Sequence, residues 1–294
     1  MREIKVPRPE TINLQVNGKS IAGIRHRVQG EDSPTKLLCL HGWLDNANSF
    51  LPMMSLLPDM DIVAIDMPGH GFSDHLDSTY TVPDSAYWAA AVIKALGWER
   101  CHIAGHSLGG IIAPLVAVGI PDTIESLILI ESSGALTAEP DEFVERLQHS
   151  MSDQLIENKY QSRIYTNKDE AINARLASAK MNTNSARLII DRQLTECDDG
   201  WRWRFDPKLR VSTAHRLTEE HVRAVNASIQ CPVLTIIAKD GYLTSREQTA
   251  SRMKLIKDHR SVTLTGHHHL HMDTPEPVAA AMNRFLGTTP ALGG

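Results

Sequence analysis

The sequence lacks any long apolar run and any block of like charges. Nowhere in its 294 residues do about eighteen apolar side chains follow one another, the length that a membrane-spanning helix needs. The 30 basic and 35 acidic residues leave a net charge of −5 that is spread along the chain, which argues against nucleic acid or an anionic membrane as a partner. The opening MREIKVPRPE has no apolar core of a signal peptide, so we expect a cytoplasmic protein.

Cysteines are few and lie far apart, with no C-x-x-C pair. Three of the four adjoin or lie within apolar runs, so we interpret them as small, reduced core residues. With 42% hydrophobic and 22% charged residues, the chain has the composition of a globular protein large enough to bury a sizeable core.

Short apolar runs alternate with helix-like stretches along most of the chain. Runs without strict polar alternation are typical of strands buried on both faces of a parallel sheet. The expected strands are 36–41, 61–66, 101–106, 124–131, 232–238 and 261–265, and the clearest helices are 85–97, 107–119 and 275–286. Before them, Asn17-Gly18 predicts a hairpin turn. We therefore expect an α/β fold: a mostly parallel sheet of about eight strands, flanked by helices and entered through an antiparallel hairpin.

One long interval interrupts this alternation. About a hundred mostly polar residues separate the sixth strand from the next, a length typical of an inserted lid. We predict a helical cap over 134–212, without a large core of its own, inserted into a core domain made of 1–133 and 213–294. Five large apolar side chains could line an acyl pocket or pack the cap against the core: Met151, Met181, Trp201, Trp203 and Phe205.

The strongest chemical signal is the G-x-S-x-G motif Gly105-His106-Ser107-Leu108-Gly109. A strand enters it and an apolar helix leaves it. Flanking glycines permit the crowded turn on which a serine projects its hydroxyl beside a helix N-terminus. We therefore expect Ser107 to be a nucleophile.

A serine needs a base to take its proton. His268 lies after the last expected strand and before the final helix, which gives the chain order Ser then His. We expect His268 within roughly 2.6–3.2 Å of Ser107, or somewhat farther without a ligand. The surrounding run of histidines, 267–271, has no facing cysteine or carboxylate set at ligand spacing, so we expect neither a metal nor a cofactor.

An oxyanion hole needs two N–H donors. The first is expected from Leu108, the residue after the nucleophile. The second is expected from Trp43, in the loop after the third strand, where Gly42 permits a tight turn.

Four ordered motifs resemble the α/β-hydrolase superfamily. They are HGW at 41–43, D-x-P-G-x-G-x-S at 66–73, GHSLGG at 105–110, and a final G-x-H followed by Asp273 and Pro275. The segments HGWLDNANSF, DIVAIDMPGHGFSDH and GWRWRFDPKLR are similar to the serine hydrolase-like (kraken-type) proteins. The resemblance implies an α/β-hydrolase fold and a triad of serine, histidine and an acid.

The acid of the triad has two candidates. The resemblance implies an acid after strand seven, usually as Gly-x-x-Asp, but here Gly241 occupies the aspartate position and Asp240 stands one residue early. Glu131, at the end of strand six, is the competitor, because some haloalkane dehalogenases carry their acid there although their nucleophile is aspartate. We expect one of the two to orient His268 and favour Glu131. Asp45 and Asp66 we interpret as loop-forming.

These residues predict a carboxylesterase-type serine hydrolase that cleaves small to medium acyl esters. The alternatives are a catalytically weak hydrolase-fold binding or receptor protein, and the same triad acting on lactones or carbon–carbon bonds. The expected partner is a small-molecule ester, and the sequence does not determine the oligomeric state.

Overall fold

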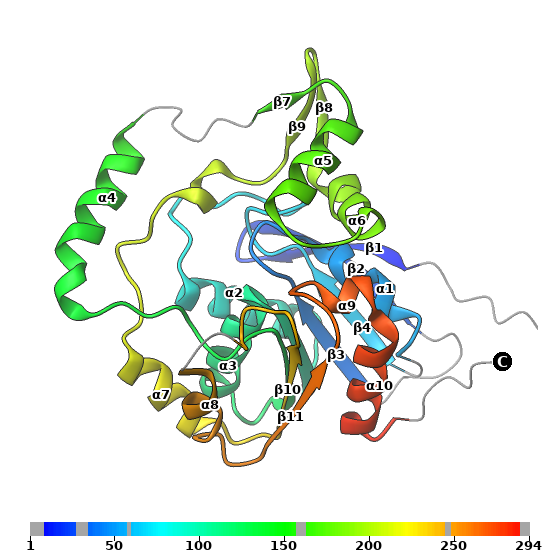
Figure 1. The fold of residues 1–294 in the computed structure, drawn as a ribbon, viewed down its shortest axis with the longest axis vertical. Coiled ribbons are helices and arrows are strands. Elements are labelled where there is room, and N and C mark those ends of the chain that lie inside the picture. The colour runs from blue at the N-terminus through cyan, green and yellow to red at the C-terminus, as the bar shows by residue number, and fades with distance from the viewer. Residues whose placement is uncertain (1–8, 28–34, 58–59, 157–162, 245–247, 289–294) are drawn as a thin grey trace, which may run out of the picture.

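Eight strands form one sheet in the order β1-β2-β4-β3-β5-β6-β10-β11 (Figure 1). The protein is represented by a computed structural model that describes residues 9–27, 35–57, 60–156, 163–244 and 248–288. The strands are β1 Glu10–Val16, β2 Lys19–His26, β3 Thr35–Leu40, β4 Met60–Ile65, β5 Cys101–His106, β6 Ile124–Ile130, β10 Val233–Ala238 and β11 His259–Leu264. Residues 1–8, most of the opening segment MREIKVPRPE, lie outside the described residues.

The first two strands form the expected hairpin. Asn17 and Gly18 both have positive φ, 50° and 77°, and Val16 pairs with Lys19, as a two-residue type I′ turn requires. β2 then pairs antiparallel with β4, and the remaining pairs are parallel. The predicted fold class is confirmed.

Helices cover both faces of the sheet because its strands are apolar on both sides. On β6, Leu127 packs in one apolar cluster and its neighbour Ile128 in the other. The first cluster includes α2 (Val82–Ala95) and α3 (Leu108–Gly119), beside which lie α7 (Glu219–Ser228) and α8 (Gln248–Met253). The second includes α1 (Leu51–Met54), which follows the short helix η1 (Ala47–Phe50), together with α9 (Leu270–Asp273) and α10 (Pro275–Leu286).

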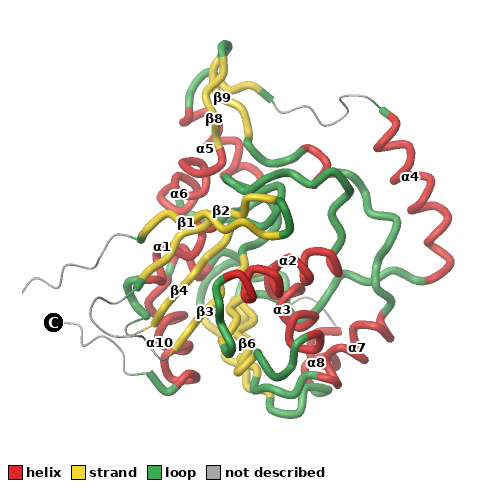
Figure 2. Tube along the Cα trace, turned by 180° about the vertical axis from the view of Figure 1, so that it is seen from behind, coloured by secondary structure: helices red, strands yellow, loops and turns green. Residues whose placement is uncertain are grey.

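The segment 134–212, which we call the inserted segment, contains strands as well as helices. Its elements are η2 Pro140–Glu142, α4 Phe143–Leu155, β7 Ile164–Tyr165, α5 Lys168–Ser178, α6 Thr183–Gln193, β8 Leu194–Cys197, β9 Gly200–Trp203 and η3 Pro207–Arg210. The small antiparallel sheet β7-β9-β8 was not expected, since we predicted a helical cap. Its strands are too short to show a periodic pattern in the sequence. Both views place α4 apart from α5 and α6 (Figures 1 and 2).

Four of the five large apolar side chains singled out in the sequence pack within the inserted segment. Trp201, Trp203 and Met181 pack on a small cluster formed by β7, α5, α6 and β8. Phe205 is buried with its ring 5.6 Å from that of Trp203, whereas Met151 is exposed. The division of the chain into core and cap domains stays a prediction.

Two cysteines, Cys39 and Cys101, are buried, and Cys197 and Cys231 are partly buried; all four are free thiols. Within the described ranges, no helix combines the length and the apolar character that crossing a membrane requires.

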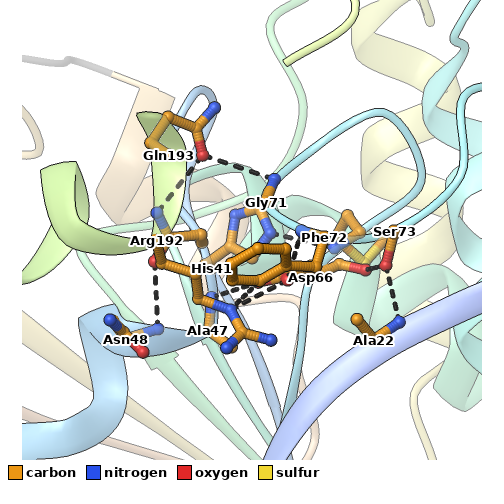
Figure 3. A network of polar contacts seen from close by, with 12 residues as sticks. Ala22, His41, Ala47, Asn48, Asp66, Gly71, Phe72, Ser73, Arg192 and Gln193 are labelled. Carbon is orange, nitrogen blue, oxygen red and sulfur yellow. Dashed lines mark hydrogen bonds and ion pairs between the residues drawn. The ribbon is translucent and has the colours of Figure 1, made fainter. Parts of the chain in front are cut away.

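A buried ion pair joins the inserted segment to the core. Asp66, after β4, accepts N–H groups from Ala47 and Phe72, so it organises two core loops as expected. Its carboxylate also accepts a hydrogen bond from Arg192 Nε of α6, which lies 2.8 Å from both oxygens (Figure 3). Both side chains are almost completely buried.

Removing Arg192 would leave the Asp66 charge buried without a partner. We expect Arg192→Ala to lower the free energy of unfolding by about 3–5 kcal/mol, measured by denaturant titration. Arg187→Ala, on the same helix, is the control: Arg187 pairs with Asp169 at 3.9 Å and both are exposed, so the loss should stay below about 1 kcal/mol. Equal losses in the two variants would contradict this account.

Candidate active site

Ser107 lies at the sharp turn between β5 and α3. Its backbone adopts φ 50° and ψ −110°, a strained conformation for a residue other than glycine. The turn is crowded, because a Cβ at Gly109 would lie 1.9 Å from the carbonyl oxygen of Leu40. Glycine thus lets α3 begin directly against the end of β3. The Gly109 N–H donates to the carbonyl of His41 at 3.1 Å, which ties the turn to the loop after β3.

His268 contacts Glu131. The imidazole Nδ1 lies 3.2 Å from Glu131 Oε2. Glu131 follows β6 with φ 52°, and its side chain is completely buried. Its carboxylate also accepts the N–H groups of Ala238 at 2.7 Å and Tyr242 at 2.9 Å. A buried carboxylate is costly unless donors satisfy it, and here the loops after β10 and β11 supply them.

Asp240 lies elsewhere. It is exposed, and it contacts the histidine run through its carbonyl, which is 3.4 Å from His267 Nδ1. The reason is the shape of the loop after β10, which wraps around the Glu131 carboxylate. A Cβ at Gly241 would lie 2.2 Å from Glu131 Oε2, so the glutamate fills the space that a side chain at 241 would need. The structure brings Glu131 to His268 and leaves Asp240 outside.

Ser107 and His268 line one open pocket. Its other lining residues are Ile111, Glu131, Ser132, Ser133, Gly134, Leu136, Tyr242 and Leu243. Tyr242 packs on the His268 imidazole with ring centroids 4.4 Å apart. Among the described residues no hydrogen bond joins Ser107 to His268, and such contacts are often long in enzymes without substrate.

The expected oxyanion donors come from the start of α3 and from the loop after β3. Leu108 is the first residue of α3, so its N–H has no acceptor within the helix. Trp43 lies in the loop after β3, in which Asp45 N–H donates to Gly42 at 3.1 Å. Its indole is half exposed and donates to the carbonyl of Leu209, so it contacts the inserted segment. The roles of the two main-chain N–H groups stay predictions.

A buried polar cluster lies beside these residues. Asp45, His106 and His269 each offer one atom that could bind a metal, and the three atoms lie within 4.8 Å of one another. The guanidinium of Arg175, from α5, already pairs with Asp45 and lies 3.5 Å from His269 Nε2. This set therefore fits an arginine better than a metal ion.

Two histidines in and beside this cluster, His106 and His271, have lowered pKa values. Burial and the neighbouring histidines lower the pKa of His106 well below its usual value. Burial likewise lowers the pKa of His271 to about 3. Sequence reasoning did not single out His106 or Arg175. His106 could have been noted as the residue before the nucleophile, but Arg175 lies in a polar helix with no local signal.

Comparisons with known proteins agree with the fold and the motifs. The model of the alpha/beta hydrolase fold family matches residues 36–274. A serine hydrolase-like protein of Danio rerio is 29% identical over 282 residues, covering 90% of this chain and 85% of the relative. Serine hydrolase-like protein 2 of Homo sapiens is 29% identical over 276 residues, covering 86% of this chain and 87% of the relative.

A solved structure gives the same result. The crystal structure of a hypothetical protein from Pseudomonas aeruginosa PAO1 has 31% sequence identity and a TM-score of 0.86, covering 94% of this chain and 98% of that one. The family model spans most of the chain, including the serine turn and the histidine loop. The chain therefore belongs to the α/β-hydrolase fold family and is similar to serine hydrolase-like proteins.

Proposed function

We propose that the protein is a carboxylesterase-type serine hydrolase whose triad is Ser107, His268 and Glu131. The observation that carries the proposal is the contact of 3.2 Å between His268 Nδ1 and the buried Glu131 carboxylate, in a cavity that Ser107 also lines. That contact also favours an enzyme over a binding protein, because it supplies the acid that a working triad requires.

The reaction follows from these positions. Ser107 Oγ attacks the acyl carbonyl while His268 Nε2 takes its proton. Glu131 holds the Nδ1–H tautomer and stabilises the imidazolium that forms. The N–H groups of Leu108 and Trp43 stabilise the oxyanion. The alcohol leaves with the proton from His268, and water then releases the acid from the acyl-enzyme by the same steps.

The lining of the pocket supports a small to medium acyl group. Its apolar walls include the side chains of Ile111, Leu136 and Leu243. Pockets with mostly apolar walls and few polar groups bind small molecules by shape and orient them by the polar groups. A carboxylic ester with a short acyl chain fits this description.

Covalent labelling tests the nucleophile. We expect a fluorophosphonate probe to label the wild-type protein at Ser107, because only this hydroxyl lies on the strained turn beside a helix N-terminus. Ser107→Ala should lose both labelling and hydrolysis of p-nitrophenyl butyrate. Ser132→Ala, which removes another hydroxyl from the same cavity, should still be labelled. Labelling at a serine other than 107 would overturn the assignment.

Two matched substitutions test the acid. Glu131→Gln should lower kcat by about 10⁴-fold, because an amide cannot hold His268 in the reactive tautomer. Asp240→Asn makes the same chemical change on an exposed side chain, and kcat should stay within about twofold of wild type. Steady-state kinetics, with circular dichroism as the check on folding, decide the matter. A larger loss in the Asp240 variant would reverse the assignment.

Chelation tests the expectation of no metal. The proposed triad and oxyanion donors supply both the base and the charge stabilisation, so EDTA should leave kcat/KM unchanged. A loss of activity on chelation that added zinc restores would instead make the cluster of Asp45, His106 and His269 a functional metal site.

A further inference from the structure

One buried carboxylate, that of Asp45, lies among the three segments that meet at the proposed triad. Its Oδ2 is 3.4 Å from His269 Nε2, next to the proposed base, and 3.7 Å from His106 Nδ1, next to the proposed nucleophile. Its Oδ1 pairs with Arg175 Nη2 of the inserted segment. Gly42 makes the approach possible, because a Cβ there would lie 2.9 Å from both Asp45 Oδ2 and His106 Nδ1.

The ion pair of Asp45 and Arg175 is protected from water. The Asp45 side chain is 1% exposed and that of Arg175 13%. Burial disfavours the charged form of Asp45, but Arg175 and His269 outweigh it and hold the pKa of this carboxyl well below its usual value. The pair therefore carries two opposite charges, and the loss of either would leave the other uncompensated.

His106 fixes the backbone of the proposed base. Its Nε2 lies 2.9 Å from the carbonyl oxygen of His268, and because a carbonyl only accepts, Nε2 carries the hydrogen. In the neutral ring, Nδ1 then faces Asp45 without a hydrogen. The strand that leads to Ser107 thus holds the loop of His268 directly.

The inserted segment contacts the same loop after His268. Asp273 of α9, five residues after His268, accepts the Asn182 N–H at 3.0 Å and the Ser185 hydroxyl at 2.6 Å, both at the start of α6. Arg175 contacts His269 and Asp45 from α5. Two helices of the inserted segment therefore contact residues that follow His268 closely in the chain.

We propose that Asp45 and Arg175 are positioning residues for His268, so that the inserted segment takes part in orienting the base as well as in covering the pocket. The proposal rests on the triad proposed above. If the positioning role holds, Asp45 and Arg175 should affect the His268 imidazole in two separable ways. Their charges should shift the pKa of His268 in opposite directions. The geometry of the His268 loop should depend on both side chains, so the loss of either should slow the reaction.

The titratable and charged groups around His268 come from several elements. Glu131 after β6, His106 on β5, Tyr242 after β10 and the next residue, His269, contact it, with His267 before it in the chain and His271 close by. The pair of Asp45 and Arg175 lies behind His106 and His269. Within this set only Asp45 and Arg175 are changed in the test below, so the other groups act as a constant background.

The test is an NMR titration of the His268 imidazole, first in wild type, the two single variants and the double variant. Asp45→Asn leaves the Arg175 charge unpaired, which disfavours the imidazolium, so the pKa of His268 should fall by about half a pH unit or more. Arg175→Gln leaves the Asp45 charge unpaired and should raise it by a similar amount. The double variant Asp45→Asn/Arg175→Gln should return the pKa close to that of wild type.

Rates separate positioning from charge. All three variants, the double variant included, should react with the fluorophosphonate probe about tenfold more slowly than wild type, with kcat for p-nitrophenyl butyrate falling more than KM changes. Arg175→Lys keeps the charge and should restore the pKa but only part of the rate. Arg192→Gln is the matched control, because it breaks the other buried ion pair of the inserted segment, and it should leave the pKa of His268 unchanged.

The outcomes are distinguishable from those of the proposed function. Shifts of equal sign in the two single variants, no shift, or an equal shift in Arg192→Gln would overturn the positioning role. A double variant that reacted with the probe and hydrolysed the ester at wild-type rates would also overturn the positioning role. If the wild-type protein neither reacts with the probe nor hydrolyses the ester, the proposed function fails, and the titration still decides whether the ion pair controls His268. If Asp45→Asn does not fold, Arg175→Gln and Arg175→Lys decide alone.

Discussion

The buried carboxylate of Glu131 is the constraint on which the arrangement of the site depends. It accepts the N–H groups of Ala238 and Tyr242 and contacts His268, so it fixes the loops after β10 and β11 at once. A charge without exposure to water requires such donors, and any loop that moved away would leave it unsatisfied. The same carboxylate explains Gly241, because its oxygens occupy the space beside that backbone.

The parallel sheet explains why these groups meet. Ser107 and Glu131 follow the neighbouring strands β5 and β6. Both have positive φ, so the chain turns sharply at the end of each strand. Ligand sites in open α/β sheets lie at the carboxyl ends of the strands for this reason. The strain of two such residues is sustained by the apolar packing of the strands behind them, which are buried on both faces.

The inserted segment is attached to the core by charge as well as by packing. Arg192 of α6 forms an ion pair with Asp66, and Arg175 of α5 forms one with Asp45. Each aspartate lies in a loop at the carboxyl end of a strand, and each pair is shielded from water. Buried ion pairs contribute little net stability over apolar contacts. They do require the two side chains to stay in contact, since a displaced partner leaves a buried charge unpaired. They therefore specify where α5 and α6 lie relative to the strand-end loops.

The sequence by itself determined the order of strands and helices, the hairpin at Asn17-Gly18 and the turn that presents Ser107, because these depend on local periodicity and on backbone conformations that few residues adopt. It also narrowed the acid to Glu131 or Asp240. The tertiary structure decided which of the two meets His268, because that depends on how one loop folds around a carboxylate far away in the chain. It also decided the partners of Asp45 and the small sheet of the inserted segment. Arg175 and Asp45 are 130 residues apart in the sequence, and only packing brings an arginine of a polar helix to an aspartate after β3.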